Sequence, residues 1–245
     1  MATPSPSRPG RPKPPPPTLV LLVRHGATPT TGKVLPGRAA GLHLAESGRA
    51  QADVVAARLQ AWATAGSGAP RRRPGARGRT APSATSTDAP AIYASPLERA
   101  RETAAPIAKA LGQRVSVNRG LLECDFGEWT GAELKDLARK PEWSTVQRYP
   151  SGFRFPGGES FTAMQARIVD TVATLVSRHR GGSVIAVSHA DPIKAVVADA
   201  LGTHLDLFQR IVVSPCSVTA ISYAPTGPTV LAVNSTGSLQ DLRPS

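Results

Sequence analysis

The segment TLVLLVRHG, residues 18–26, carries the strongest structural signal in the chain. Its first six residues are apolar or β-branched without interruption, which is typical of a strand buried on both faces of a parallel sheet. A second run of this kind, SVIAVSHAD at residues 183–191, also passes from an apolar stretch into a histidine. The two runs predict two central strands that place His25 and His189 just beyond their ends.

Helical and strand patterns alternate outward from these two runs. Alternation of this kind, with two strands apolar on both faces, indicates a mostly parallel sheet covered by helices. We therefore predict an α/β protein, a three-layer α/β/α sandwich with a mostly parallel central sheet and the last two strands at one edge. Ligands of such sheets bind beyond the carboxyl ends of the strands, where the two histidines are expected. The predicted helices are 47–62, 96–111, 134–139, 160–179 and 192–201, and the other predicted strands are 91–94, 114–117, 217–223 and 229–233.

Two segments, residues 1–17 and 64–90, hold almost no apolar side chains and are rich in proline, glycine and arginine. Neither can bury enough surface to offset its ordering entropy. We predict a disordered, proline-rich basic tail at 1–17 and a disordered arginine-rich insert at about 64–90. Residues 18–245 are predicted to form a single domain that this insert interrupts.

The formal net charge of this 245-residue chain is +12, and a charge of this size is common in nucleic-acid-binding proteins. Seven of the twelve net charges lie in the tail and the insert. No aromatic residues alternate with those arginines, as they do in proteins that bind single strands. The pattern favours a solvated loop over a nucleic acid partner, and RNA binding by the insert stays open as a lesser alternative.

The longest apolar run, Leu19 to Val23, is far shorter than the ~20 residues that a membrane span needs. Cys124 and Cys216 show neither the spacing of a disulfide framework nor that of a metal site. We therefore expect a cytoplasmic protein with reduced cysteines and no membrane partner. The sequence leaves the oligomeric state open.

The residues around the two histidines are suited to anion chemistry. Arg24 precedes His25, and Gly26 follows it and allows a ligand to approach the backbone closely. Guanidinium groups bind phosphate oxygens in a forked geometry. A single histidine after a strand is more often a hydrogen-bonded turn residue, but two histidines in matched positions favour a joint catalytic role.

Four separated segments resemble the histidine phosphatase superfamily, in its phosphoglycerate-mutase-like branch. They are LLVRHGAT at 21–28, YASPLERARETA at 93–104, LLECDFGEWTG at 121–131 and AVSHADPIKAVV at 186–197. The resemblance spans about residues 18–235 without the insert. It implies a metal-independent phosphomonoesterase that hydrolyses a small phosphate ester through a phosphohistidine intermediate and needs no cofactor.

The same resemblance implies roles for individual residues. His25 would be the catalytic nucleophile, and Glu123 would be the proton donor. Arg24, Arg99 and His189 would bind the transferring phosphoryl group, with His189 also part of the catalytic set.

These residue types match what the reaction requires. Transfer of a phosphoryl group spreads charge over three equatorial oxygens, which two guanidiniums and an imidazole can neutralise without a metal. Positive neighbours also lower the pKa of His25 and keep its ring neutral and nucleophilic at pH 7. Thr28 follows closely enough for its hydroxyl or amide to reach the phosphate.

Other polar residues near the motifs have less certain roles. Asp125 and Glu128 are rivals of Glu123 as proton donor, although Glu123 occupies the position that matches the family. Ser95 is expected to cap the following helix rather than to bind phosphate. Glu159 is expected at the rim of the pocket.

The chain departs from the glycolytic mutase pattern in three places. Residues 27–31 read ATPTT and lack a tryptophan and an asparagine, Cys124 stands where an arginine usually follows the glutamate, and residues 140–160 hold no tandem arginine pair. These losses favour a phosphatase, while a phosphomutase, and less so a protein that only senses phosphate esters, stay as alternatives.

Six of the eleven aromatic residues lie between Glu123 and Glu159. They would either shape a pocket for a partly apolar or ring-bearing leaving group or form a small core beneath an irregular cap. The sequence does not decide between these two interpretations. The six residues are Phe126, Trp129, Trp143, Tyr149, Phe153 and Phe155.

Overall fold

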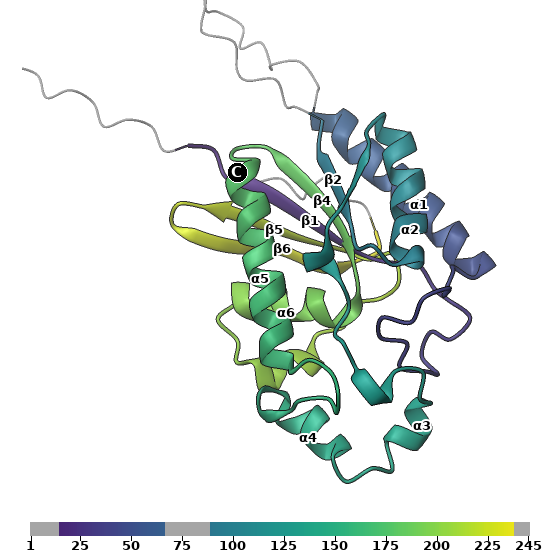
Figure 1. Ribbon diagram of the computed structural model, residues 1–245. Coiled ribbons are helices and arrows are strands. Elements are labelled where there is room, and N and C mark those ends of the chain that lie inside the picture. Colours follow the sequence, from purple (N-terminus) through teal and green to yellow (C-terminus); the bar gives the residue numbers. More distant parts are fainter. Residues whose placement is uncertain (1–14, 67–88, 238–245) are drawn as a thin grey trace, which may run out of the picture.

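The computed structural model describes residues 15–66 and 89–237 (Figure 1). Most of the predicted tail at 1–17 and of the predicted insert at 64–90 lies outside these ranges. The disorder predicted for those residues therefore stays a prediction, as does the division into one tail and one interrupted domain. Residues 64–66 are described, and they continue a helix rather than start the insert.

A six-stranded sheet forms the centre of the protein, with the strand order β3-β2-β4-β1-β5-β6. Strands β1 to β4 run parallel, whereas β5 and β6 are antiparallel to their neighbours and form one edge. This confirms the predicted α/β fold and its mostly parallel sheet. The strands are β1 (Thr18–Arg24), β2 (Ala91–Ala94), β3 (Val115–Val117), β4 (Ser183–Ser188), β5 (Val218–Ala224) and β6 (Gly227–Ser235).

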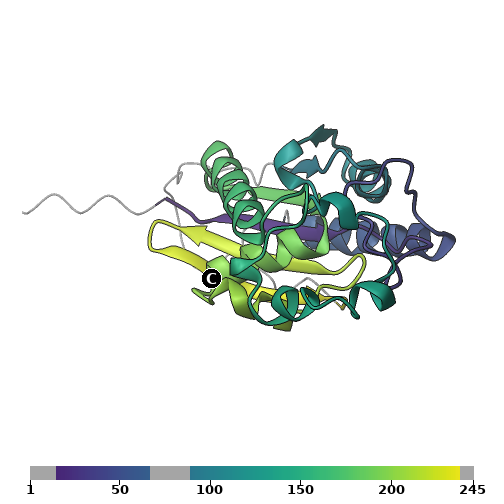
Figure 2. The same cartoon turned by 60° about the horizontal axis from the view of Figure 1, so that its bottom comes forward.

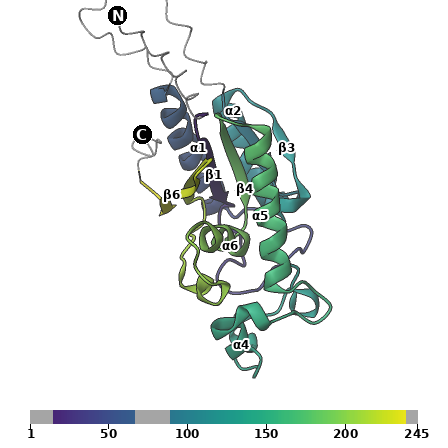
Figure 3. The same cartoon turned by 90° about the vertical axis from the view of Figure 1, so that its left-hand side faces the viewer.

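Alternate residues of β1 pack against helices on opposite faces of the sheet. Leu19 and Leu21 belong to the core formed with α1 (Glu46–Gly66) and α2 (Glu98–Leu111). Val20 and Leu22 belong to the core formed with α5 (Phe161–Arg178) and α6 (Ala190–Ala200). Figure 3 shows β1 and β4 between α1 and α5. Because side chains alternate along a strand, an uninterrupted apolar run fits a strand covered on both faces.

The segment between β3 and α5 is built from short helices and turns at the lower end of Figure 1, which Figure 2 turns forward. It contains α3 (Leu134–Leu137) and α4 (Trp143–Arg148). Three 3-10 turns, η1 (Arg119–Leu121), η2 (Gly127–Trp129) and η3 (Pro150–Gly152), join them, and η4 (Leu205–Arg210) follows α6.

Four of the six clustered aromatics form a core in this segment. Phe126, Trp129, Phe153 and Phe155 are buried, and the Phe126 and Phe155 ring centroids lie 4.8 Å apart. Tyr149, in contrast, is exposed. The small-core interpretation holds for Trp129 and Phe153, whereas Phe126 and Phe155 are part of the core and also line, with Trp143, a hollow of about 230 Å³.

Helix boundaries differ from the predictions at three places. α1 continues four residues past its predicted end at residue 62, to Gly66. α6 begins at Ala190 and carries Pro192 in its first turn, where the missing N–H has no helical partner to lose. α4 has only six residues and no repeating apolar pattern that would have predicted it. Within the described ranges, no helix has both the length and the apolar character that a membrane crossing requires.

Candidate active site

Three neighbouring strands end at one edge of the sheet. Arg24 of β1 is in register with Ser188 of β4, so His25 and His189, the residues that follow, emerge side by side. The His25 amide donates a hydrogen bond to the Ser188 carbonyl at 3.0 Å, and the two imidazole centroids lie 5.1 Å apart. On the other side of β4, the amide of Ser95 donates to the carbonyl of Val187. The sheet therefore brings together segments that are far apart in the sequence.

Two hydrogen bonds fix the tautomer of His25. Its Nδ1 lies 2.7 Å from the carbonyl oxygen of Gly26, and because a carbonyl can only accept, Nδ1 must carry the proton. The Nε–H of Arg99 donates to His25 Nε2 at 3.3 Å. Nε2 therefore holds the free electron pair that a nucleophile requires.

The electrostatic surroundings keep His25 uncharged. Burial, followed by the charges of Arg99 and Arg24, lowers the pKa of His25 to about 3. The positive neighbours act as the sequence predicted, but burial is the larger cause. The ring is neutral at pH 7.

The guanidiniums of a fully buried arginine, Arg99, and a half-buried one, Arg24, flank this ring. Arg99, in the first turn of α2, is fully buried and donates through Nη2 to the carbonyl of Gly37 at 2.7 Å. Arg24 donates through Nη1 to the carbonyl of Val213 at 2.6 Å. In the described part of the chain, neither Arg99 Nη1 nor Arg24 Nε has a hydrogen-bond partner, although both atoms are buried. Buried N–H groups without partners are costly, and a bound anion would satisfy them.

Gly37 lies in the left-handed region, with φ of +49°. A Cβ at this position would lie 3.1 Å from the ring of Phe126. The positive φ and the close contact both favour glycine in the turn that directs the Gly37 carbonyl at Arg99.

His189 completes the group. Its Nε2 lies 2.8 Å from the hydroxyl of Ser95, and its Nδ1 is buried without a partner among the described residues. Ser95 is expected to cap α2, but Leu97 is the N-cap of this helix and has no side-chain cap, and the Ser95 hydroxyl accepts a long hydrogen bond of 3.5 Å from the Leu97 amide. Ser95 instead holds the imidazole of His189.

We call Arg24, His25, Arg99 and His189 the basic cup. Burial, followed by the charges of His25, Arg99 and Arg24, lowers the pKa of His189, so its ring is neutral as well. The cup therefore contains two cations and two neutral imidazoles, and it presents three buried, unpartnered ring or guanidinium nitrogens.

Glu123 is the buried carboxylate beside the basic cup, with 7% of its surface exposed. Burial, followed by the charge of Asp191, raises its pKa to about 7, against the opposing effects of the Cys124 amide and of Arg99 and Arg24. Its Oε1 accepts a hydrogen bond from the Cys124 amide at 2.9 Å. A carboxyl group with this pKa can both give and take a proton near neutral pH.

The two rival carboxylates lie in different surroundings. Asp125 is partly exposed, accepts a hydrogen bond from the Gly127 amide and pairs with Arg38 at 3.4 Å. Glu128 is exposed. Burial lowers the pKa of Arg24 and of Arg99, and the charge of Glu123 opposes this shift in both, whereas neither Asp125 nor Glu128 has this effect. These surroundings favour Glu123 as the acid.

Glu159 lies in an ion-pair network rather than at an open rim. It pairs with Arg38 at 2.8 Å and with Arg167 at 2.9 Å, and the Asp125 amide donates to it at 3.1 Å. Sequence reasoning missed both arginines. Arg38 lies in a loop without periodicity and Arg167 looks like a surface residue of an amphipathic helix, so no local signal marks them.

Thr28 is buried, but its groups are engaged locally. Its amide donates to the Thr31 hydroxyl at 2.8 Å, and its own hydroxyl lies 3.0 Å from the same oxygen. Only the hydroxyl is left for an anion, and a role of Thr28 in phosphate binding stays a prediction.

The histidines, cysteines and carboxylates of residues 15–66 and 89–237 form no group of three or more that could hold a metal ion. The basic cup instead supplies positive charge through guanidiniums. The prediction that the chemistry needs no metal stays to be tested in solution.

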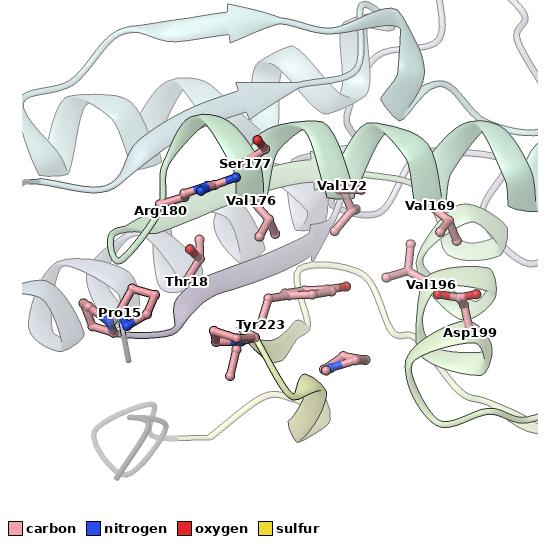
Figure 4. A pocket seen from close by; sticks show the side chains of 16 residues that line it. Pro15, Thr18, Val169, Val172, Val176, Ser177, Arg180, Val196, Asp199 and Tyr223 are labelled. Atoms are coloured by element: carbon pink, nitrogen blue, oxygen red, sulfur yellow. The ribbon is translucent and has the colours of Figure 1, made fainter. Parts of the chain in front are cut away.

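A second hollow lies at the opposite end of β1 (Figure 4). This cavity of about 550 Å³ is lined by valines of α5 and by Tyr223, with Thr18 at its side. Arg180 and Asp199 are the charged residues of its lining, and it contains none of the predicted site residues. It is therefore a different kind of site from the basic cup.

The fold and the basic cup together define an α/β protein with an anion site centred on two histidines. The family model of the histidine phosphatase superfamily (branch 1) matches residues 78–236, and the chain belongs to this superfamily. The matched range begins after Arg24-His25-Gly26, yet β1, which delivers these residues, pairs along its length with β4 inside that range.

Curated relatives include proteins of different activity. The bifunctional protein Rv2228c of Mycobacterium tuberculosis is 34% identical over 151 residues, 61% of this chain and 42% of that protein. Phosphoserine phosphatase 1 of Hydrogenobacter thermophilus is 31% identical over 127 residues, 48% and 56% of the two chains. A probable phosphoglycerate mutase of Salmonella newport is 29% identical over 135 residues, 54% and 62%. The chain spans less than two thirds of the length of each of these relatives.

Solved structures share the fold. A mycobacterial glucosyl-3-phosphoglycerate phosphatase is similar with a TM-score of 0.70 and 24% identity, covering 89% of this chain and 99% of that one. A phosphoserine phosphatase of Entamoeba histolytica in complex with 3-phosphoglyceric acid has a TM-score of 0.72 at 22% identity, covering 89% and 98%.

Proposed function

We propose that this chain is a metal-independent phosphomonoesterase that hydrolyses a small phosphate ester through a phosphohistidine intermediate on His25. The observation that carries the proposal is a set of three buried nitrogens, on Arg24, Arg99 and His189, that have no partner within residues 15–66 and 89–237 and lie around the neutral ring of His25. Such groups are costly unless an anion satisfies them. A phosphoryl group has three oxygens to accept their hydrogen bonds.

In the first step the Nε2 electron pair of His25 attacks phosphorus. The P–N bond forms as the bond from phosphorus to the ester oxygen breaks, and the electron pair of that bond stays on the ester oxygen. Arg24, Arg99 and His189 stabilise the charge on the three equatorial oxygens. Protonated Glu123 gives its proton to the leaving oxygen, so the alcohol departs neutral.

In the second step a water molecule takes the place of the alcohol. Ionised Glu123 accepts a proton from this water while its oxygen attacks phosphorus. The P–N bond breaks, the electron pair returns to Nε2, and inorganic phosphate leaves. The pKa of about 7 at Glu123 suits both proton transfers, because the group is close to half protonated at neutral pH.

A second candidate, a phosphomutase, shares the first step. The similarity to a probable phosphoglycerate mutase favours it. The absence of a tandem arginine pair in residues 140–160 favours hydrolysis, since nothing there would grip a substrate carboxylate. We also propose a cytoplasmic location, because both cysteines are free and buried.

The test is a panel of phosphorylated metabolites incubated with the purified chain in EDTA, with release of inorganic phosphate as the signal. We expect release from at least one small ester that EDTA does not reduce. Each assay is repeated with a bisphosphorylated primer, and transfer that exceeds hydrolysis only with the primer assigns the mutase instead. Release that is lost in EDTA and restored by a divalent ion contradicts the proposal.

A further inference from the structure

The backbone of Glu123 lies outside regular secondary structure, between η1 and η2, yet its carboxyl group has to reach the basic cup. Its carbonyl oxygen accepts hydrogen bonds from two arginines that come from different elements. Arg38, in the loop between β1 and α1, donates through Nε at 2.9 Å. Arg167 of α5 donates through Nη2 at 3.3 Å.

Arg167 also holds the residues before Glu123. Its Nη1 donates to the carbonyls of Gly120 at 2.8 Å and Leu122 at 2.9 Å. One rigid guanidinium thus binds three carbonyls between residues 120 and 123. A guanidinium can do this because its five N–H groups have a fixed planar arrangement.

The Glu159 carboxylate binds both arginines. Its carboxylate accepts two hydrogen bonds from Arg167, both at 2.9 Å, and one from Arg38 at 2.8 Å. It also accepts the amide of Asp125, two residues after Glu123. Charge-assisted, bidentate bonds of this kind restrict the position of a side chain more than single neutral bonds do.

The same loop connects Glu123 to the basic cup. Gly37, whose carbonyl binds Arg99, is the neighbour of Arg38. Loss of the bond between Arg38 and the Glu123 carbonyl would therefore let the proton donor shift relative to the phosphate-binding guanidinium, which the Gly37 carbonyl still holds. Misplacement of a reacting group by about 1 Å can cost about 10²-fold in rate.

We propose that Arg38, Arg167 and Glu159 are positioning residues for proton transfer by Glu123. This inference rests on the proposed function, in which Glu123 gives a proton to the leaving alcohol. The three residues act through the backbone of Glu123, and the expected signature is a defect confined to reactions that need the proton.

Leaving groups separate this role from general structural support. p-Nitrophenolate departs without a proton, whereas an alkoxide requires one. A variant that only weakens the fold or the cup lowers kcat/KM for both kinds of ester alike. A variant that misplaces the proton donor lowers kcat/KM mainly for the alkyl ester.

The experiment compares Arg38→Gln with Arg38→Lys, because the Arg38 side chain is 28% exposed and substitution there leaves the core intact. Glu159→Gln, which keeps the shape of the side chain, is the second variant. The matched control is Arg154→Gln, since Arg154 is exposed and its side chain, among the residues that the structure describes, donates to the nearby carbonyl of Gly158 and not to Glu123 or Glu159. Melting temperature and kcat/KM for p-nitrophenyl phosphate and for glycerol 2-phosphate are measured for each.

For Arg38→Gln and Glu159→Gln we expect kcat/KM to fall about 10-fold or more for the alkyl ester and less than about 3-fold for the aryl ester. The loss for the alkyl ester is a part of the ~10²–10⁴-fold that general acid catalysis supplies. Arg38→Lys should restore part of the loss, and Arg154→Gln should match the wild type. Equal losses for both esters, or none in either variant, overturn the proposal. His25→Ala distinguishes a failure of this inference from a failure of the proposed function. Activity that survives this substitution would overturn the proposed function itself, in which His25 is the nucleophile.

Discussion

Three of the four residues of the basic cup lie at the ends of hydrogen-bonded strands, whereas Glu123 lies in a segment of short turns that side chains hold in place. His25 and His189 are adjacent because Arg24 and Ser188 are paired in the sheet. Glu123 is held by guanidinium groups from a loop and from α5. The backbone hydrogen bonds of the sheet therefore fix the positions of the two histidines, whereas the position of Glu123 depends on a few side-chain contacts.

This difference has a functional meaning for the two parts. Phosphate binding and nucleophilic attack are common to all substrates of such a site, while protonation of the leaving group depends on the alcohol. Protonation of the leaving alcohol depends on the segment that contains Glu123, which is held separately from the sheet. This segment can therefore differ while the sheet and the cup stay the same. The following predictions separate the two parts, beginning with the largest effect.

Loss of the nucleophile should affect every substrate. We expect His25→Ala to reduce kcat/KM for aryl and alkyl esters alike by on the order of 10⁴-fold or more, because it removes the Nε2 electron pair that attacks phosphorus, while the other imidazole of the cup, His189, is held by Ser95. Steady-state assays with both esters measure this. His43→Ala is the control, since His43 is an exposed histidine paired with Glu102, and a similar loss in both variants would assign the effect to folding.

Loss of the acid should depend on the alcohol. Glu123→Gln is expected to lower kcat/KM for an alkyl ester by about 10²–10⁴-fold and to leave that for p-nitrophenyl phosphate nearly unchanged. Because Glu123 gives its proton only in the protonated form, wild-type kcat/KM for the alkyl ester should fall as the pH rises through about 7. A pH profile of both esters tests this, and a loss of the same size for the two contradicts the assigned role.

Replacing a guanidinium of the cup by an ammonium keeps the positive charge but should weaken the binding of the phosphoryl group. Arg99→Lys is expected to lower kcat/KM for both esters by on the order of 10²-fold, since an ammonium cannot reproduce the forked donors of arginine. Arg101→Lys, on the exposed side of the same helix, is the matched control. An Arg99→Lys enzyme with wild-type kcat/KM and an unchanged melting temperature would falsify the role of the fork.

The smallest expected effect is on stability. The folded-state pKa of Glu123 is raised from 4.5 to about 7, so the unfolded chain releases this proton first and stability falls as the pH rises across that interval. Glu123→Gln should flatten the decline, and Glu128→Gln, at an exposed carboxylate, should not. Urea denaturation midpoints at pH 5 and pH 8 measure the difference, and parallel declines in all three proteins contradict it.

His25 makes the opposite contribution to the pH dependence of stability. The folded-state pKa of His25 is lowered from 6.5 to about 3, so stability from this group is lost as the pH falls through that range. The two windows overlap between pH 4.5 and 6.5, where the two contributions oppose each other, so burial of the two groups favours a stability maximum within this overlap.

Much of the basic cup could be predicted from the sequence, because its residues follow runs with strong local signals. The apolar stretches before His25 and His189 predict buried strands, and parallel strands end at a common edge. Arg99 and Glu123 were found only through the family resemblance, since neither helix periodicity nor charge marks one arginine or carboxylate over its neighbours.

The remainder depends on contacts between distant segments. Arg38 and Glu123 are 85 positions apart, and Arg38 and Glu159 are 121 apart. No local pattern encodes such pairs, so the network around Glu123 was missed. Ser95 was assigned to a helix cap for the same reason, because its actual partner, His189, is 94 positions away.

The most direct test of the account is to trap the covalent intermediate. In Glu123→Gln, p-nitrophenyl phosphate should still transfer its phosphoryl group, but hydrolysis should be slow because the base for water is missing. We predict a burst of about one p-nitrophenolate per active site and a base-stable, acid-labile phosphate on the peptide that contains His25, detected by mass spectrometry. No burst, or phosphate found on a different residue, would contradict it.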